Sequence, residues 1–234
     1  MSRGSILPEP VPRDTPEAMY EDWINSHPIS VLPIPSQPAP RDFFDVLQSR
    51  RSSRTLGRLG ALELGELLYR TAKTLEVRRR SVQPDWEHRP LPSSGGCNAV
   101  GILVIPPPSA EEEGGIYDSR VHGLRPLITA PEIRKLATTL LVEMEIQGEP
   151  TLLVFFADPL RIAGYYSNWE SLVWRDSGVL VGGLSLTAGA MNLGFCPLGL
   201  TGDAIVKAAF PDQNVFGVGG CVVGAINIDE SAHL

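Results

Sequence analysis

Five residues in the first quarter of the chain have the side-chain chemistry of a phosphate-binding segment. Residues 50–54 read RRSSR, so the guanidiniums of Arg50, Arg51 and Arg54 and the hydroxyls of Ser52 and Ser53 lie within five positions. Guanidinium and hydroxyl groups donate strong hydrogen bonds to phosphate oxygens. A solvated helix end rich in cations would have the same composition. The run therefore predicts either an anion clamp or an exposed helix terminus.

Two further segments have the composition of backbone platforms. Residues 92–96 read PSSGG, in which the glycines let the main chain approach a flat ligand and the hydroxyls can donate to its polar edge. Residues 196–200 read CPLGL and follow a long stretch of small residues, so their main-chain amides could lie beneath a ring. A plain loop before a strand and an ordinary helix-to-helix connection are the respective alternatives.

Several familiar catalytic motifs are incomplete. Residues 183–187 (GLSLT) lack the last glycine of a nucleophile elbow. Residues 217–222 (GVGGCV) lack the closing small residue of the dinucleotide fingerprint, and no glycine-rich loop is followed by a Walker lysine. The histidines and cysteines are dispersed without zinc-ligand spacing, so we expect no metal site and no disulfide framework.

Composition bounds the class of protein. The chain has 234 residues, 43% of them hydrophobic and 20% charged, which excludes a wholly disordered protein. Its net charge of −7 argues against a nucleic-acid binder that works by bulk charge. The N-terminus has no apolar signal segment, and the apolar stretch at 179–196 is interrupted by glycines and polar residues. We therefore expect a cytoplasmic protein that binds neither nucleic acid nor membrane.

The elements that would position these segments do not alternate regularly. Apolar residues at helical spacing predict helices from residue 43 to the basic run and at 62–77, 132–146, 169–193 and 203–210. Runs of β-formers predict strands at 100–105, 116–118, 124–128, 151–156 and 215–228. The helix at 169–193 is almost wholly small and apolar after its start, which indicates a helix enclosed on all sides. Helices outnumber scattered strands, so we predict an α+β fold.

The first forty residues differ from the rest. They contain nine of the 21 prolines, and each proline fixes φ and pushes its predecessor out of the helical region. We therefore divide the chain into a proline-rich extended N-terminal arm, residues 1–40, and one domain, residues 41–234. The arm is of a kind that can wrap a neighbouring molecule.

The order of the three candidate segments is more informative than any one of them. An RRSSR run, a PSSGG loop before a strand, and a small-residue helix leading to GFCPLG together resemble the nitroreductase family. Within that family they resemble the SagB-type dehydrogenases, which include the azoline oxidases of peptide natural-product pathways. The resemblance extends from residue 43 to residue 228 and leaves out the arm.

The resemblance implies a cofactor and an assembly. It implies a nitroreductase-like fold, with a mixed antiparallel sheet flanked by helices, a long buried central helix, and FMN at a homodimer interface. Three sets of residues correspond to the family's flavin-binding segments: Arg50, Arg51, Ser52 and Arg54 at the phosphate and pyrimidine edge, Pro92, Ser93, Ser94 and Gly95 in the family's PSAG loop, and Pro197, Leu198, Gly199 and Leu200 facing flavin N5. This agrees with the residue chemistry, because a flavin needs a phosphate clamp, amide donors and an apolar floor.

The sequence also departs from the family pattern. Gly164 and Tyr165 stand where azoline oxidases have a lysine-tyrosine pair, and residues 176–178 read DSG in place of EAG. Ala99 replaces the proline that closes the loop motif, and Ala225 replaces a late basic residue. Tyr165 is then the remaining candidate for proton transfer, although a tyrosine pKa near 10 requires help from its surroundings.

These observations predict an FMN-dependent oxidoreductase. A peptide or other small-molecule biosynthetic intermediate would pass a hydride to flavin N5, a base would take the neighbouring proton, and oxygen would reoxidise the cofactor. One alternative is an NAD(P)H-dependent nitro- or ene-reductase on the same fold. An alternative of another class is a non-catalytic scaffold that docks a partner, for instance in a biosynthetic complex, through the arm.

Overall fold

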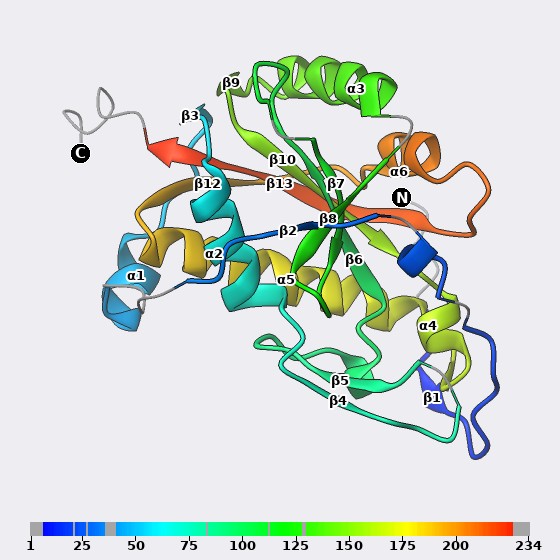
Figure 1. Ribbon diagram of the computed structural model, residues 1–234. Coiled ribbons are helices and arrows are strands. Elements are labelled where there is room, and N and C mark those ends of the chain that lie inside the picture. Colours follow the sequence, from blue (N-terminus) through cyan, green and yellow to red (C-terminus); the bar gives the residue numbers. More distant parts are fainter. Residues whose placement is uncertain are drawn as a thin grey trace, which may run out of the picture.

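A computed structural model gives the arrangement of the chain (Figure 1). It describes residues 7–20, 22–26, 28–35, 41–82, 84–111, 113–127 and 130–226. A central sheet lies between two helical layers, with α5 (Glu170–Ala190) below it and α3 (Ala130–Glu143) and α6 (Asp203–Ala209) above it. The predicted α+β architecture is therefore confirmed.

The central sheet is almost wholly antiparallel. Its order is β2-β8-β7-β6-β10-β13-β3-β9, with β12 also paired to β13, and among the described strands only β3 and β9 run parallel. The strands are β2 (Ser30–Val31), β3 (Thr55–Gly57), β6 (Val100–Ile105), β7 (Gly115–Asp118), β8 (Gly123–Pro126), β9 (Gln147–Gly148), β10 (Thr151–Ala157), β12 (Leu193–Leu198) and β13 (Phe216–Ile226). Residues 128, 227 and 228, which the sequence assigned to strands, lie outside the described residues.

The middle of the sheet is apolar because it is covered on both faces. All seven residues of β10 are buried, and the strand lies between β6 and β13. Phe155 packs into the core on the α5 side, whereas Phe156 packs with residues of α3 and α6 on the other side. A strand covered on both faces reads as a continuous apolar run, which is why residues 151–156 were recognisable as a strand.

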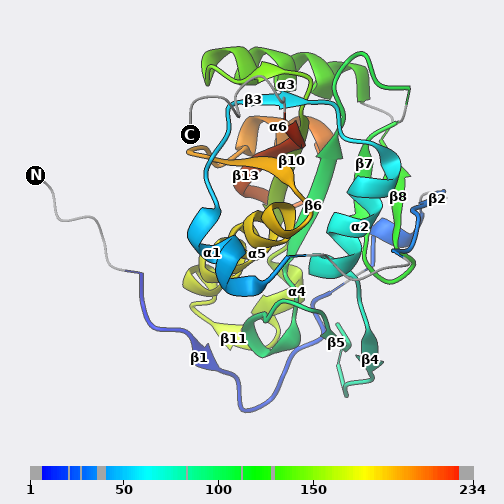
Figure 2. The ribbon, with the colours of Figure 1, turned by 90° about the vertical axis from the view of Figure 1, so that its left-hand side faces the viewer.

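The long helix α5, seen nearly end-on below the central sheet in Figure 2, has one exposed side. Leu180 and Leu184 face the core, but Trp174 is 43% exposed and Val179 is 37% exposed. A Cβ atom added at Gly178 or Gly182 would meet no atom within 4 Å. The expectation of a helix enclosed on all sides is therefore wrong for the part of a single chain that the structure describes, because no other described element covers that stripe. Within the described residues, no helix has the length and apolar composition to cross a membrane.

Three shorter helices complete the helical layers. They are α1 (Phe43–Ser49), α2 (Ala61–Ala72) and α4 (Leu160–Ala163). The Asp42 side chain caps α1 by accepting hydrogen bonds from the backbone N–H groups of Phe44 and Asp45. Only Val46 of α1 is buried, so the aromatic residues of this helix face solvent in the single chain.

The second predicted helix is too long by five residues. The sequence predicted residues 62–77, but α2 ends at Ala72 and residues 76–78 form β4 (Glu76–Arg78), which pairs with β5 (Trp86–His88). Leu75 continues the helical spacing, yet Leu75 and Val77 are both exposed at the edge of the hairpin. Cross-strand pairing with a segment predicted as loop has overridden the local periodicity.

The described part of the N-terminal arm packs against the domain of the same chain. β1 (Val11–Pro12) pairs with β11 (Tyr166–Ser167), a short 3₁₀ turn spans Ile24–Ser26, and β2 pairs with β8. Between these pairings the Trp23 ring packs edge-on against Phe210. The arm therefore contributes both an edge strand and an apolar anchor to the fold.

Candidate functional site

The basic run predicted as an anion clamp lies between α1 and β3. Arg50 ends α1, where its backbone N–H donates to the carbonyl oxygen of Val46. The Arg50 guanidinium has no hydrogen bond or ion pair with the described part of the chain, and Ser52 is exposed. The Arg51 guanidinium donates to the carbonyl oxygens of Gln48 (3.1 Å) and Arg50 (2.9 Å). Arg50 and Ser52 are therefore open to an anion.

Arg54, by contrast, is engaged in the fold. Its Nη1 donates to the carbonyl oxygen of Met144 (2.9 Å) and lies 3.8 Å from the carboxylate of Glu145, just beyond the end of α3. A cation at a helix C-terminus satisfies a terminal carbonyl group and complements the helix dipole. The backbone N–H of Ser53 donates to the carbonyl oxygen of Phe195 (3.0 Å), which fastens the clamp beside β12.

The GFCPLG segment is mainly strand, not the helix-to-helix connection that the sequence predicted. Residues 193–198 form β12 and pair with β13 along their length. Phe195 packs into the core on the α5 side and Cys196 into the core on the opposite side. Successive side chains on opposite faces of the sheet are typical of a strand. The pattern was not recognised in the sequence because the segment directly follows the small-residue helix.

The four residues predicted to face the flavin ring lie at the end of β12. Leu198 is buried, Leu200 is half-buried, and Pro197 and Gly199 are exposed. A Cβ atom added at Gly199 would meet no atom within 4 Å. The backbone at this turn is therefore open to a flat ligand.

The PSSGG loop is fastened to α5 by a buried carboxylate. Asp176 accepts hydrogen bonds from Ser93 Oγ (2.7 Å), Ser94 Oγ (2.8 Å) and the Ser94 backbone N–H (3.0 Å). Pro92 is exposed at the start of the loop, and Ser94–Gly96 form a 3₁₀ turn. Because both hydroxyl groups donate to Asp176, the loop offers a ligand its main chain more than its side chains.

Two glycines are required in this loop. Gly95 and Gly96 have φ values of 56° and 64°, in the left-handed region that favours glycine. A Cβ atom at Gly95 would overlap the Tyr166 hydroxyl, and one at Gly96 would overlap the Trp86 ring nitrogen. The Arg80 guanidinium donates to the carbonyl oxygen of Gly95 from the outside. The loop is therefore a rigid, preformed platform.

The two tyrosines that follow α4 have different surroundings. The Tyr165 hydroxyl, predicted to transfer protons, donates to the carbonyl oxygens of Val82 (2.5 Å) and Pro84 (3.1 Å). The Tyr166 hydroxyl has no hydrogen-bond partner in the described chain and faces Gly95. Burial raises the pKa of Tyr166, so at neutral pH its hydroxyl is protonated. Tyr166 is thus the tyrosine that presents a proton beside the loop, and the sequence analysis did not single it out.

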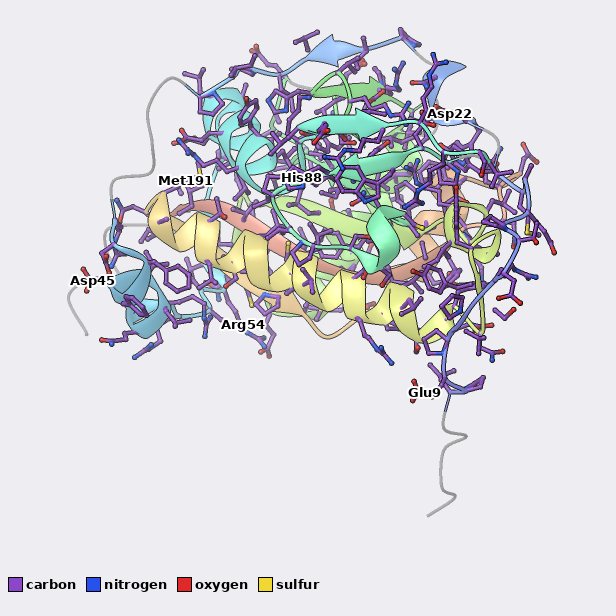
Figure 3. All side chains as sticks on the ribbon, turned by 90° about the horizontal axis from the view of Figure 1, so that it is seen from below. Glu9, Asp22, Asp45, Arg54, His88 and Met191 are labelled. Atoms are coloured by element: carbon purple, nitrogen blue, oxygen red, sulfur yellow. The ribbon has the colours of Figure 1, made fainter. Side chains whose placement is uncertain are left out.

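The clamp and the loop lie on opposite sides of α5. The loop leads into β6, and β10 and β13 separate β6 from β12 in the sheet, a spacing of about 14 Å. Figure 3 shows Arg54 and His88 on opposite sides of α5, and His88 belongs to β5, which lies next to the loop. The clamp and the β12 turn therefore share one side, and one chain alone does not bring the loop to them.

A buried ionic network behind the loop was missed by the sequence analysis. The Glu87 side chain is 1% exposed and accepts hydrogen bonds from Arg89 (2.6 Å), Arg120 (2.7 Å) and Arg161 (3.4 Å). Burial acts to raise the pKa of Glu87, but the guanidiniums, Arg89 and Arg161 foremost, outweigh it and lower the pKa to about 2. The only sequence signal was the same-face spacing of Glu87 and Arg89 in a strand. Arg120 and Arg161 arrive from distant segments.

The network lines a small polar cavity under the N-terminal arm. Its volume is about 60 Å³, and Tyr20, Glu87 and Arg161 are among its walls. A cavity of this size holds a few water molecules. Among the described residues, no cluster of His, Cys, Asp and Glu side chains could hold a metal ion. The prediction that the protein has no metal site also covers the residues outside the described ranges, so it stays a prediction.

Comparison with known proteins identifies the fold. No family model and no curated protein matches the sequence. A candidate nitroreductase from Ralstonia eutropha superimposes with a TM-score of 0.65 at 19% identity, covering 94% of this chain and 98% of the other. The Escherichia coli microcin synthetase McbBCD complex, with truncated pro-MccB17 bound, gives 0.54 at 16% identity, covering 76% and 67%. A candidate NADH oxidase from Clostridium acetobutylicum gives 0.50 at 16%, covering 79% and 89%.

These likenesses establish the class of structure. The chain has a nitroreductase-like fold, in which helices flank a mixed antiparallel sheet. The fold class expected from the resemblance is therefore confirmed. At identities below 20% the superpositions show the fold and not the reaction.

Proposed function

We propose that the protein is an FMN-dependent oxidoreductase that works as a homodimer. The observation that carries the proposal is the division of its ligand-binding residues between the two sides of α5. One side has Arg50, whose guanidinium has no partner among the described residues, and an open turn at Gly199. The other side has the preformed loop at Ser93–Gly96. A second copy docked on the open stripe of α5 would bring its loop to the clamp of the first.

The residues present fit FMN. The half-buried Arg50 and the exposed Ser52 are donors suited to a phosphate, and the open side of Gly199 leaves room for a flat ring. Ala225, where the family has a basic residue, pairs with Gly57 beside the clamp, so the phosphate would depend more heavily on the arginine run. When bound, FMN would supply a two-electron acceptor for oxidation of the substrate, with molecular oxygen as the final oxidant.

The chain's own residues would bind and orient the flavin, and they would move one proton. Arg50 and Ser52, with Arg51 beside them, would hold the anion. Gly199 and the loop main chain would enclose the flat ring, and a tyrosine would handle the proton released when the substrate is oxidised. Of the pair, Tyr165 is committed to two carbonyl oxygens, so the geometry favours Tyr166. A protonated phenol acts as a donor or relay, so the substrate's own basic atom or a water would take the proton first.

The proposed substrate class is a peptide or other biosynthetic intermediate, in the manner of the SagB-type dehydrogenases, in the cytoplasm. It is supported by the likeness to a microcin synthetase complex that holds truncated pro-MccB17, which also makes a biosynthetic complex a reasonable setting. A nicotinamide-driven nitro- or ene-reductase is the second candidate, favoured by the likeness to the Ralstonia eutropha protein. Reduction of the bound flavin by NADH or NADPH under anaerobic conditions would establish the second candidate, and the absence of that reduction would leave the first.

A direct test is titration of the purified protein with FMN, followed by flavin fluorescence. We expect saturable binding of about one FMN per chain. A protein that is colourless as isolated and binds no added FMN would contradict the proposal and support the scaffold alternative.

The dimer predicts the effect of a bulky residue on the open stripe. Gly182→Arg should leave the fold of each chain intact, because no other described element lies within 4 Å of a Cβ at this position. In a dimer the same side chain would meet the second copy. Light scattering should therefore show twice the chain mass for the wild type and a single chain for the variant. Ala204→Arg, on the exposed face of α6, is the matched control and should remain dimeric.

The clamp predicts a difference between the half-buried Arg50 and the exposed Arg79. Arg50→Ala should weaken FMN binding ten- to a hundred-fold, because a charged hydrogen bond contributes about 1.5–3 kcal/mol. Arg79→Ala removes a cation from the end of β4 and should leave the affinity unchanged. Isothermal titration with FMN measures both. Equal affinities for the two variants would overturn the assignment of the clamp.

A further inference from the structure

Each residue of the loop at 93–97 makes a hydrogen bond with a side chain that lies outside the loop. Asp176 takes the first two residues, as described above. The next three carbonyl oxygens each accept a hydrogen bond from a separate donor: Gly95 from Arg80, Gly96 from Asn98 Nδ2 (3.3 Å) and Cys97 from Arg161 Nε (3.1 Å). The conformation of the loop therefore depends on groups that lie outside it.

Arg161 joins the loop to the N-terminal arm. Its side chain is 12% exposed, and its Nη1 donates to the Tyr20 hydroxyl (3.0 Å) while its Nη2 faces Glu87 (3.4 Å). The guanidinium also lies over the Tyr20 ring, 4.8 Å from its centre. A guanidinium has five donors in a fixed plane, so its contacts with Tyr20, Glu87 and Cys97 constrain one another. Tyr20 thus fixes the orientation in which Arg161 reaches the loop.

A second connection runs through Glu87. Its backbone carbonyl oxygen accepts a hydrogen bond from Asn98 Nδ2 (3.0 Å), the same amide that holds Gly96. Tyr20 itself is kept in place by neighbours in the arm: the backbone N–H of Glu17 donates to the carbonyl oxygen of Gly164 (2.9 Å), and Trp23 Nε1 donates to the Asp158 carboxylate (3.2 Å). The arm, the ionic network and the loop therefore form one continuous set of contacts.

We propose that Tyr20 of the N-terminal arm is a positioning residue: acting through Arg161, it holds residues 93–97 in the conformation that meets the flavin. The contact between the loop and the flavin rests on the proposed function, whereas the coupling between the arm and the loop does not. Loss of Tyr20 leaves a buried guanidinium with unsatisfied donors. Arg161 then turns toward water and releases the Cys97 carbonyl.

Hydrogen exchange of the flavin-free protein tests the coupling. The amides of Ser94, Gly96, Cys97 and Asn98 are all hydrogen-bonded and should exchange slowly in the wild type. Tyr20→Ala should raise their exchange rates about tenfold and raise the Kd for FMN about tenfold, the size expected for one buried hydrogen bond. Tyr20→Phe keeps the ring over Arg161 but loses the hydroxyl, and should show a smaller change in the same direction. Arg13→Ala, an arm variant whose guanidinium binds Ala163 instead, is the control.

The outcomes separate the two claims. Faster loop exchange in both Tyr20 variants, without a change in Arg13→Ala, supports the coupling. This holds even if the wild type binds no FMN, because the lack of FMN binding would refute only the proposed function. Unchanged loop exchange would overturn the inference. So would faster exchange with an unaltered Kd for FMN, or an equal effect of Arg13→Ala, which would indicate general loosening of the arm.

Discussion

Replacing Glu87 by glutamine is expected to lower the free energy of unfolding by about 3–5 kcal/mol at neutral pH, the cost of removing one partner from a buried ionic cluster. The substitution keeps the shape of the side chain but leaves Arg89, Arg120 and Arg161 without their shared carboxylate. Unfolding in urea, followed by tryptophan fluorescence, measures the change.

The matched control is Glu76→Gln in the neighbouring strand. Glu76 also pairs with an arginine, Arg78 (2.8 Å), but both side chains are about half exposed or more. Exposed ion pairs contribute about 0–1 kcal/mol, so this variant should unfold almost like the wild type. A similar loss of stability in the two variants would show that the buried network contributes no more to the free energy of unfolding than an exposed ion pair does.

The same network gives a pH dependence with a definite sign. Because the folded-state pKa of Glu87 is depressed to about 2 from its ordinary value of 4.5, its contribution to stability is present above pH 4.5 and is lost as the pH falls through 2. The difference in stability between the wild type and Glu87→Gln should therefore shrink between these two values. A difference that does not change with pH would contradict the assignment of charge to Glu87.

The second large effect is expected at the tyrosine pair. Tyr166→Phe should lower turnover by about 10²–10⁴-fold, the usual contribution of a positioned proton-transfer group, while FMN stays bound. Tyr165→Phe should lower the melting temperature instead, because its hydroxyl anchors the carbonyl oxygens of Val82 and Pro84.

Anaerobic stopped-flow reduction of the bound flavin by substrate separates the two roles. A normal reduction rate in Tyr166→Phe with a slow rate in Tyr165→Phe would reverse the assignment and restore the role that the sequence predicted for Tyr165. Normal rates in both variants would assign the pair to packing alone.

Much of the fold was readable from the sequence because its signals are local. The run of β10 and the length of α5 follow from apolar patterning, and the RRSSR, PSSGG and GFCPLG segments are contiguous in the chain. The end of α2 was not readable, since Leu75 keeps the helical spacing of the apolar face and the evidence against a helix there is the pairing of β4 with β5.

The partners of the candidate site depend on tertiary structure. Asp176 was noted only as a departure from a motif, yet its carboxylate fastens the loop, because the fold brings it to Ser93 and Ser94 from 82 and 83 residues away. Glu87 likewise gathers arginines from three segments. Arg54 was assigned to a ligand by its place in a basic run, whereas the structure shows that it also caps α3.

The most direct test of a flavin held between two copies is a mixed dimer. One chain would carry Arg50→Ala and Arg51→Ala in the clamp, and the other Asp176→Ala behind the loop, with different affinity tags so that the heterodimer can be isolated. Neither variant should retain FMN as a homodimer. In the heterodimer, one site combines both defects, and the other combines the intact clamp of one chain with the intact loop of its partner. We therefore predict one FMN per heterodimer, whereas a heterodimer without FMN would show that each site lies within a single chain.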